Sequence, residues 1–216
     1  MNITLLVTLG APVVIVLSII HLDKFKEPTD LILKTFFIGI LLCVPAGLLN
    51  DLLIDTNEQS YRAGLIEESL KFLVLYFYIR TKIAFDEPMD AIVYGTIISL
   101  GFATLENFSY VYYLSSEADS LNVAIARSMS AIPLHATCGV IMGYFFGLHA
   151  FLQSKPALVQ SLAIPIGIHA IYNYLVVSQD LLWFYFLFAV MVYARHLHTK
   201  IYDLQRENSQ QEKKVI

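Results

Sequence analysis

The chain has 216 residues, of which 57% are hydrophobic and 15% are charged, and its mean hydropathy is +0.63. Soluble globular domains carry roughly 25% charged residues, so the composition excludes an ordinary soluble domain and indicates a membrane protein. The formal net charge of −4 and the pI near 5.8 provide no broad basic surface, which argues against nucleic acid as a partner.

Seven apolar segments approach the length of about 20 residues that a helix needs to cross a lipid bilayer. In chain order they run approximately over Ile3–Ile20, Leu31–Leu53, Ala63–Ile79, Met89–Leu114, Ala131–Leu152, Leu158–Val177 and Leu181–Ala194. The stretch from Leu121 to Ser130 is either an interfacial turn or the outer end of the fifth span. The sequence therefore predicts an all-α, polytopic transmembrane helical bundle in residues 1–195, followed by a polar cytoplasmic tail in residues 196–216.

Lys and Arg are unequally distributed between the connectors of these segments. The first, third and fifth connectors and the tail hold most of them, including Lys26, Arg80, Lys82 and Lys155, whereas the second and fourth connectors are mainly acidic. Short cytoplasmic loops carry the excess of Lys and Arg in membrane proteins. We therefore expect a multi-pass protein with its N-terminus outside and its C-terminus in the cytoplasm.

Polar side chains interrupt four of the apolar segments at a similar depth. At about 1.5 Å of rise per residue, they lie roughly 6–12 Å below the expected outer surface: Glu67, Glu68, Lys71, Glu106, His135, His169 and Asn173. Glu67 and Lys71, like His169 and Asn173, are four residues apart and share a helix face. A buried carboxylate is costly without a partner, so we expect these groups to satisfy one another in one interior site.

Two imidazoles and several carboxylates form a donor set that suits a divalent metal ion. A catalytic zinc site uses three protein ligands and keeps a fourth position open, with a carboxylate nearby as the general base. We therefore expect Zn²⁺ to be held by Glu106, His135 and His169. Either Glu67 or Glu68 would then take the proton from water.

Lys71 and Asn173 complete the expected site. The lysine charge would stabilise the glutamates, and the asparagine amide would donate to a developing oxyanion. This set is suited to hydrolysis of an amide or related acyl bond, close to the outer membrane surface. Two other interpretations remain open: Glu67 and Lys71 form a structural ion pair, or buried carboxylates bind protons or cations in a non-enzymatic transporter or sensor.

Four segments carry a resemblance to a known family: GLIEESLKF, FDEPMDAIVYGTIISLGFATLENFSY, LHATCGVIMGYFFG and GIHAIYNY. In this order they resemble the signature blocks of the PrsW family of bacterial intramembrane metalloproteases, which is related to the CAAX-prenyl protease and Abi family. The resemblance extends from about residue 28 to about residue 177. It implies that the EExxK motif falls on Glu67, Glu68 and Lys71, the FxxxE motif on Phe102 and Glu106, and the histidine motifs on His135 and on His169 with Asn173.

The resemblance also implies an activity and a place in the cell. The implied reaction is site-1 cleavage of a membrane-spanning anti-sigma factor, on the extracytoplasmic side of the bacterial plasma membrane. A site-2 protease then acts on the remnant, and release of an extracytoplasmic-function sigma factor starts a stress response. A peptidase acting on other membrane peptides, as in the CAAX and Abi relatives, is the alternative. A scheme for those relatives without an obligatory metal would make Glu67 and either His135 or His169 the catalytic pair.

Overall fold

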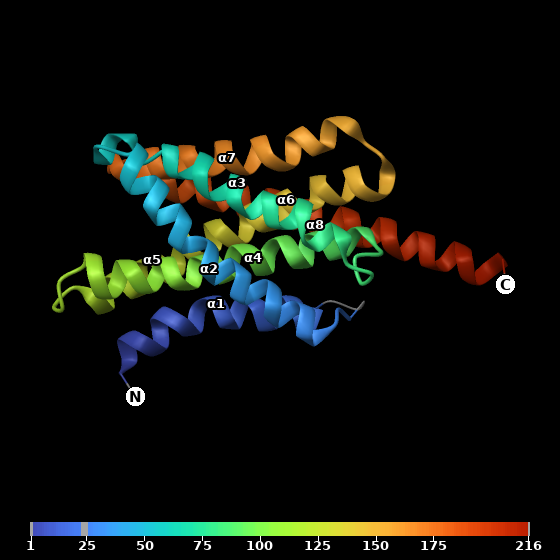
Figure 1. Cartoon of the computed structure of the whole chain (residues 1–216), viewed down its shortest axis with the longest axis horizontal. Helices are drawn as coiled ribbons and strands as arrows, with labels where there is room; N and C mark the ends of the chain where they lie inside the picture. Colours follow the sequence, from blue (N-terminus) through green and yellow to red (C-terminus); the bar gives the residue numbers. More distant parts are fainter. Residues whose placement is uncertain (1, 23–25, 216) are drawn as a thin grey trace.

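The computed structural model describes residues 2–22 and 26–215, and the regular elements in these ranges are helical. The α-helices are α1 (Ile3–Leu22), α2 (Thr29–Leu53), α3 (Arg62–Phe77), α4 (Pro88–Ser109), α5 (Ser120–Met129), α6 (Ala131–Leu152), α7 (Lys155–Val177) and α8 (Leu182–Val215). Three short segments join them, namely η1 (Asn57–Gln59), η2 (Ile79–Thr81) and the π-helix η3 (Tyr110–Leu114). The longer helices run broadly along one axis, and the two ends of the chain lie at opposite ends of the bundle (Figure 1).

The long helices follow the predicted spans closely. α6 begins and ends at the predicted residues, and α1, α2 and α7 differ from the prediction by a few residues. α5 is a helix of its own, separated from α6 by a break at Ser130, where φ is −132° and ψ is −77°. α5 occupies the stretch for which the sequence allows two interpretations, an interfacial turn or the outer end of the fifth span.

Five helical stretches in the described ranges are long and apolar enough to cross a membrane: Ile3–His21, Thr29–Leu53, Pro88–Leu114, Ser120–Leu152 and Lys155–Val177. The other two predicted spans correspond to α3, which has 16 residues, and to the first part of α8. α3 is too short to count as a spanning helix, and three ionisable side chains of the candidate site also reduce its apolar character. Large apolar side chains such as Leu41 and Leu48 point away from the protein interior, as expected for contact with lipid.

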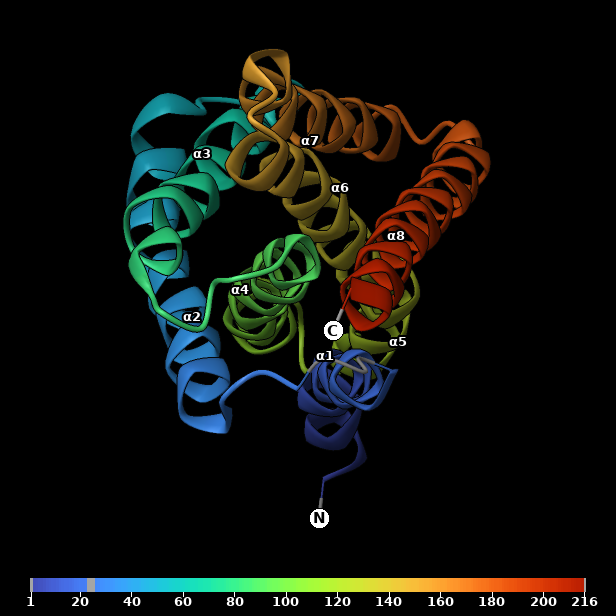
Figure 2. The same ribbon diagram turned by 90° about the vertical axis from the view of Figure 1, so that its right-hand side faces the viewer.

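α4 lies at the centre of the bundle, with the other long helices arranged around it (Figure 2). Every residue from position 89 to position 104 is buried. Glycines allow the neighbouring backbones to approach: a Cβ atom on Gly143 of α6 would overlap the carbonyl oxygen of Ala91, and one on Gly101 would overlap that of Phe36 on α2. The central position of α4 fixes the depth of its polar residues relative to those of α3 and α6.

The N-terminal end of α4 is held by polar contacts. Pro88 occupies the first turn, where its missing N–H costs nothing, and Glu87 and Asp90 form a capping box. The Tyr94 hydroxyl donates a hydrogen bond of 2.5 Å to the carboxylate of Glu27 in the preceding connector. These contacts tie the chain before α2 to the central helix.

α8 extends well beyond the apolar segment Leu181–Ala194, over which the sequence predicts the seventh span. The helix continues through the predicted boundary at residue 195 into the segment that the sequence predicts as a polar tail. Leu197, Ile201 and Gln205 are buried, and the Gln205 side-chain oxygen accepts a 3.0 Å hydrogen bond from the backbone N–H of Met89 on α4. The first part of the predicted tail therefore packs as part of the bundle.

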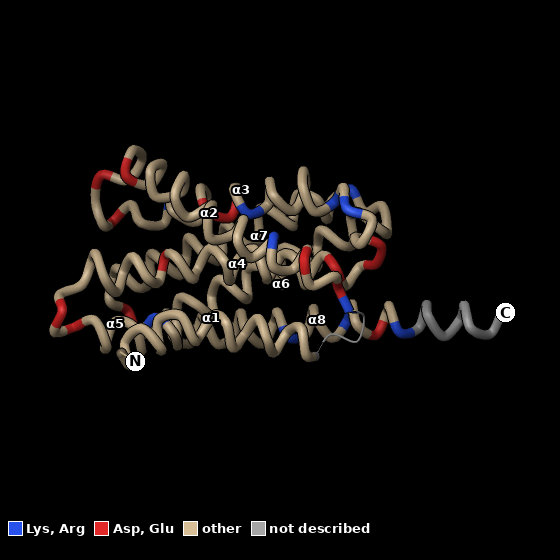
Figure 3. Tube along the Cα trace, turned by 60° about the horizontal axis from the view of Figure 1, so that its bottom comes forward, with Lys and Arg blue, Asp and Glu red and all other residues tan. Residues whose placement is uncertain are grey.

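The charged residues differ between the two ends of the bundle (Figure 3). Lys and Arg gather at the end from which α8 projects, together with several acidic side chains. The opposite end, where α2 leads into α3 and where η3 leads into α5, carries mainly Asp and Glu. The bundle is thus polarised in charge along its length.

Candidate active site

Six of the seven predicted site side chains converge where α3, α4, α6 and α7 meet. They are Glu67, Glu68 and Lys71 on α3, Glu106 on α4, His135 on α6 and His169 on α7. Five of them are almost completely enclosed, whereas 16% of the Glu106 side chain is exposed. The prediction that these residues meet in one layer of the bundle agrees with their positions in the structure.

A continuous series of polar contacts joins the two histidines. Nδ1 of His169 lies 2.9 Å from Oε1 of Glu68, and the same oxygen accepts a 2.7 Å hydrogen bond from Nζ of Lys71. Nζ of Lys71 also lies 2.9 Å from Nδ1 of His135, whose Nε2 lies 2.9 Å from Oε2 of Glu106. Because an ammonium group only donates, His135 accepts at Nδ1, so its proton is on Nε2 and is donated to Glu106.

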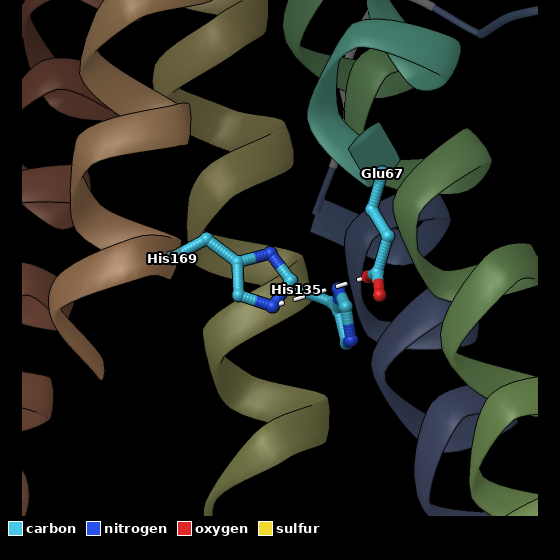
Figure 4. Close-up of side chains that lie close together, drawn as sticks. All are labelled: Glu67, His135 and His169. Atoms are coloured by element: carbon cyan, nitrogen blue, oxygen red, sulfur yellow. Dashed lines mark ion pairs between the residues drawn. The ribbon is translucent and has the colours of Figure 1, made fainter. Parts of the chain in front are cut away.

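Glu67 approaches the histidines from the opposite side of the site (Figure 4). Its Oε1 atom accepts a 3.2 Å hydrogen bond from the side-chain amide of Asn50 on α2. Its Oε2 atom is buried, has no hydrogen-bond partner among the described residues and lies 3.9 Å from Nε2 of His169. Glu67, His135 and His169 each offer one ligand atom, and these three atoms lie within 4.8 Å of one another.

This group of three suits a divalent metal ion. Because Nε2 of His135 carries the proton donated to Glu106, His135 would bind the ion through Nδ1, in place of its contact with Lys71. Zinc bonds to nitrogen and oxygen of about 2.0–2.2 Å place two tetrahedral ligand atoms about 3.4 Å apart, close to the 3.9 Å between His169 and Glu67. Glu68 holds the other ring nitrogen of His169, as carboxylates beside metal-bound histidines do. The free Glu67 oxygen would gain the partner that a buried carboxylate oxygen otherwise lacks.

Glu106, which the sequence predicts as a metal ligand, lies outside this group of three. Its Oε2 atom contacts the guanidinium of Arg127 at 2.6 Å as well as the His135 ring. Glu67, for which the sequence predicts a role as general base, lies inside the group. Each of the two carboxylates thus faces a different histidine, Glu67 facing His169 and Glu106 facing His135.

Arg127 on α5 is a site residue that the sequence reasoning did not identify. Besides Glu106, it contacts the side-chain oxygen of Asn107 through Nε at 3.0 Å, and its guanidinium carbon lies 3.9 Å from the centre of the Tyr110 ring. In the sequence, Arg127 stands in the stretch from Leu121 to Ser130, between the fourth and fifth predicted spans. Its place in the site depends on α5 packing against α1 and η3, which no local pattern indicates.

Two asparagines behave differently from the expectation. Asn50 contacts Glu67 but is not among the site residues that the sequence predicts. Its position as a polar residue inside an apolar segment is the signal that could have identified it. Asn173 was expected beside the reacting groups, but its amide donates a 3.1 Å hydrogen bond to the backbone carbonyl of Ser60 in the connector before α3. The structure therefore shows Asn173 fastening α7 to that connector.

Comparison with known proteins agrees with the geometry. Residues 27–195 match the family model described as PrsW family intramembrane metalloprotease. The chain is similar to the protease PrsW of Geobacillus kaustophilus, with 35% identity over 82% of this chain and 81% of the relative. It is also similar to the protease PrsW of Bacillus subtilis, with 32% identity over 85% and 87% of the two chains, and to that of Clostridioides difficile, with 31% identity over 73% and 72%.

No solved structure matches the chain significantly. The family match covers the helices that hold all of the converging polar groups. The relatives share one name, and the similarity extends over most of their own length. The resemblance to this family is therefore confirmed. The chain belongs to the PrsW family of intramembrane metalloproteases and is a membrane-embedded peptidase.

Proposed function

We propose that this peptidase hydrolyses a peptide bond of a membrane-spanning protein at a zinc site formed by Glu67, His135 and His169. The observation that carries the proposal is the buried, unpartnered Oε2 atom of Glu67, which faces the free ring nitrogen of His169 at 3.9 Å. Zinc, when bound, supplies a water that is nucleophilic near neutral pH and polarises the scissile carbonyl. The fourth position of such a site stays open for water and substrate.

The surrounding residues orient the ligands. Glu68 fixes the ring of His169 through Nδ1, which leaves Nε2 facing Glu67. Lys71 balances the charge of Glu68 and contacts His135, and the Lys71 ammonium lies 4.3 Å from the centre of the Phe102 ring. This arrangement compensates a buried carboxylate, which would be costly alone.

Glu106 is proposed as the group that takes the proton from the attacking water and returns it to the leaving amine. It is the carboxylate of the cluster with part of its side chain exposed, so water can reach it without displacing the buried pairs. Its contact with the proton-bearing nitrogen of His135 provides a hydrogen bond that keeps its oxygen turned towards the site. General bases must lie within such hydrogen-bond reach of the reacting groups.

Metal content and cleavage, measured on the same samples, test these roles. The variants are Glu67→Gln, Glu106→Gln and His169→Ala, with His149→Ala as a matched control because His149 lies on α6 and contacts the backbone of Ser154 instead of the cluster. We expect Glu67→Gln and His169→Ala to lose both zinc and cleavage. Glu106→Gln should keep zinc and lose cleavage, and the control should keep both.

Other results would select a different mechanism. Zinc retained in Glu67→Gln and lost in Glu106→Gln would support the ligand set expected from the sequence. Cleavage by wild-type protein that has been chelated and shown to be free of metal would contradict the zinc site, and would favour activation of water by a glutamate and a histidine. Wild-type cleavage by His169→Ala would refute the site as a whole.

A membrane-spanning anti-sigma factor is the proposed substrate, cut at its extracytoplasmic side in the bacterial plasma membrane before a site-2 protease acts. The family resemblance supports this substrate, and the charge distribution supports the side. Glu67 and His135 lie five and four residues from the starts of α3 and α6, roughly 6–8 Å from the acidic end of the bundle. This orientation requires α3 and α8 to cross the membrane together with the five more apolar stretches.

Mass spectrometry of the two fragments made from a membrane-anchored substrate tests the side of cleavage. The cut is expected near the extracytoplasmic end of the substrate's span. A cut in the cytoplasmic half of the span would contradict the proposed orientation, while leaving the peptidase activity itself intact.

A further inference from the structure

Arg127 has a set of contacts that fixes its guanidinium in one orientation. One terminal nitrogen contacts Glu106 at 2.6 Å, and Nε donates to the side-chain oxygen of Asn107 at 3.0 Å. The face of the guanidinium lies over the Tyr110 ring. A rigid fork of this kind is a property of arginine, because a lysine ammonium cannot make the two in-plane contacts with the same geometry.

Asn107 is itself held in place. It is completely buried, and its amide nitrogen donates a 2.9 Å hydrogen bond to the backbone carbonyl of Thr8 on α1. This bond determines which end of the amide is the acceptor, so the Asn107 oxygen faces Arg127. The guanidinium therefore connects α5 to α4 and, through Asn107, to α1.

The Arg127–Glu106 pair also forms the exposed edge of the polar network. The two side chains are 15% and 16% exposed, whereas those of His135 and His169 are 1% and 3% exposed. From this edge, contacts lead inwards through Glu106 to His135. A change at Arg127 would thus reach the buried histidine through one carboxylate.

We propose that Arg127 is a positioning residue of the peptidase site, which holds Glu106 against His135 at the side where water and substrate enter. The proposal rests on the proposed role of Glu106. Removal of the guanidinium leaves the Glu106 carboxylate free to turn towards solvent, and the Nε2 atom of His135 then loses its acceptor. Neither change requires the buried contacts of His169 to move.

Two measurements on purified full-length protein test this role. The first is the separation of kcat from KM in the cleavage of a membrane-anchored substrate. The second is the rate at which diethyl pyrocarbonate modifies His135 compared with His169, followed by peptide mass spectrometry. The variants are Arg127→Ala and Arg127→Lys, and Arg80→Ala is the matched control because Arg80 also lies over a tyrosine ring, at 5.2 Å.

For Arg127→Ala we expect kcat to fall about 10- to 100-fold, the usual effect of removing a group that orients a catalytic residue, with little change in KM. Modification of His135 should become several-fold faster, while His169 keeps its wild-type rate. Arg127→Lys should recover part of kcat, because it keeps the charge near Glu106 but loses the fork. Arg80→Ala should match the wild type in both measurements.

An unchanged kcat in Arg127→Ala overturns the proposal, and so does faster modification of both histidines together, which indicates general loosening of the bundle. If the alanine variant does not insert, Arg127→Lys carries the test, and wild-type kcat with wild-type His135 reactivity overturns the proposal. Glu106→Gln is measured alongside. Full activity of Glu106→Gln refutes the role of Glu106, whereas an inactive Glu106→Gln beside a fully active Arg127→Ala refutes this inference alone.

Discussion

The closeness of α4 and α6 gives a prediction with a matched control, Gly143→Ala against Gly167→Ala. In α6, a Cβ atom on Gly143 would lie 2.5 Å from the Cα atom of Ile92, compared with ordinary contacts of 3.4–4 Å, and it would overlap the Ala91 carbonyl oxygen. In α7, a Cβ atom on Gly167 has no heavy atom of a neighbouring element within 4 Å. The same added methyl group therefore meets backbone at one site and open space at the other.

The expected difference follows from this geometry. To admit the Cβ atom of Gly143→Ala, the two helices must separate by about 1 Å, and overpacking of this kind costs about 1–3 kcal/mol. Both variants gain the helix propensity of alanine over glycine, about 1 kcal/mol, so their difference isolates the overpacking. Gly143→Ala should therefore be less stable than Gly167→Ala by about 1–3 kcal/mol, or roughly 5- to 150-fold in the unfolding equilibrium.

Equilibrium unfolding in mixed detergent micelles containing increasing SDS measures this difference. The fluorescence of Trp183, the single tryptophan of the chain, reports on the packing of α8 against Tyr172 on α7, whose ring centre lies 6.3 Å away. Gly167→Ala should unfold at or above the wild-type SDS fraction, and Gly143→Ala below it. Equal midpoints for the two variants would refute the close contact between α4 and α6.

Two further predictions test a residue of the site and the packing of α8. Asn50→Leu should lower kcat about 10- to 100-fold and reduce zinc occupancy, because it removes the hydrogen-bond donor to Glu67. Asn173→Ala is the control and should keep its zinc. Equal loss of zinc in both variants would contradict the role of Asn50 in holding Glu67. Ile201→Ala should lower the free energy of unfolding by about 2–5 kcal/mol, because the Ile201 side chain is 1% exposed. Ile83→Ala, at a side chain that is 97% exposed, should leave the free energy of unfolding unchanged. Equal midpoints of the two variants in SDS titrations would show that this part of α8 does not pack against the bundle.

Hydropathy alone predicts the most apolar helices well and the third helix less securely. α6 is recognisable because 22 consecutive residues contain few groups that prefer water. α3 is shorter, and Glu67, Glu68 and Lys71 reduce its apolar character. The same charges that weaken the helix signal indicate the site, so one feature of the sequence makes the fold harder to predict and the function easier.

Spacing along a helix predicts which residues share a face, but not which neighbour covers that face. His169 and Asn173 share a face of α7, yet the connector before α3 lies over the end of α7 and takes the Asn173 amide. Similarly, Glu106 meets Arg127 because α5 packs against α1 and against η3, which follows α4. These contacts join residues that are 113 and 21 positions apart, and they depend on the tertiary arrangement.

The central position of α4 has a consequence for how the protein is assembled in the membrane. From position 89 to position 104 every side of α4 is covered by protein, and α6, which supplies part of that cover, follows it in the chain. A nascent chain that ended before α6 would leave Thr96 and Ser99, both buried in the complete bundle, without the cover of α6 in hydrocarbon, where polar groups are costly. Glu106 would keep Arg127 of α5 but lack His135 of α6. Stable residence of the middle of the protein in the bilayer therefore depends on synthesis of its C-terminal half.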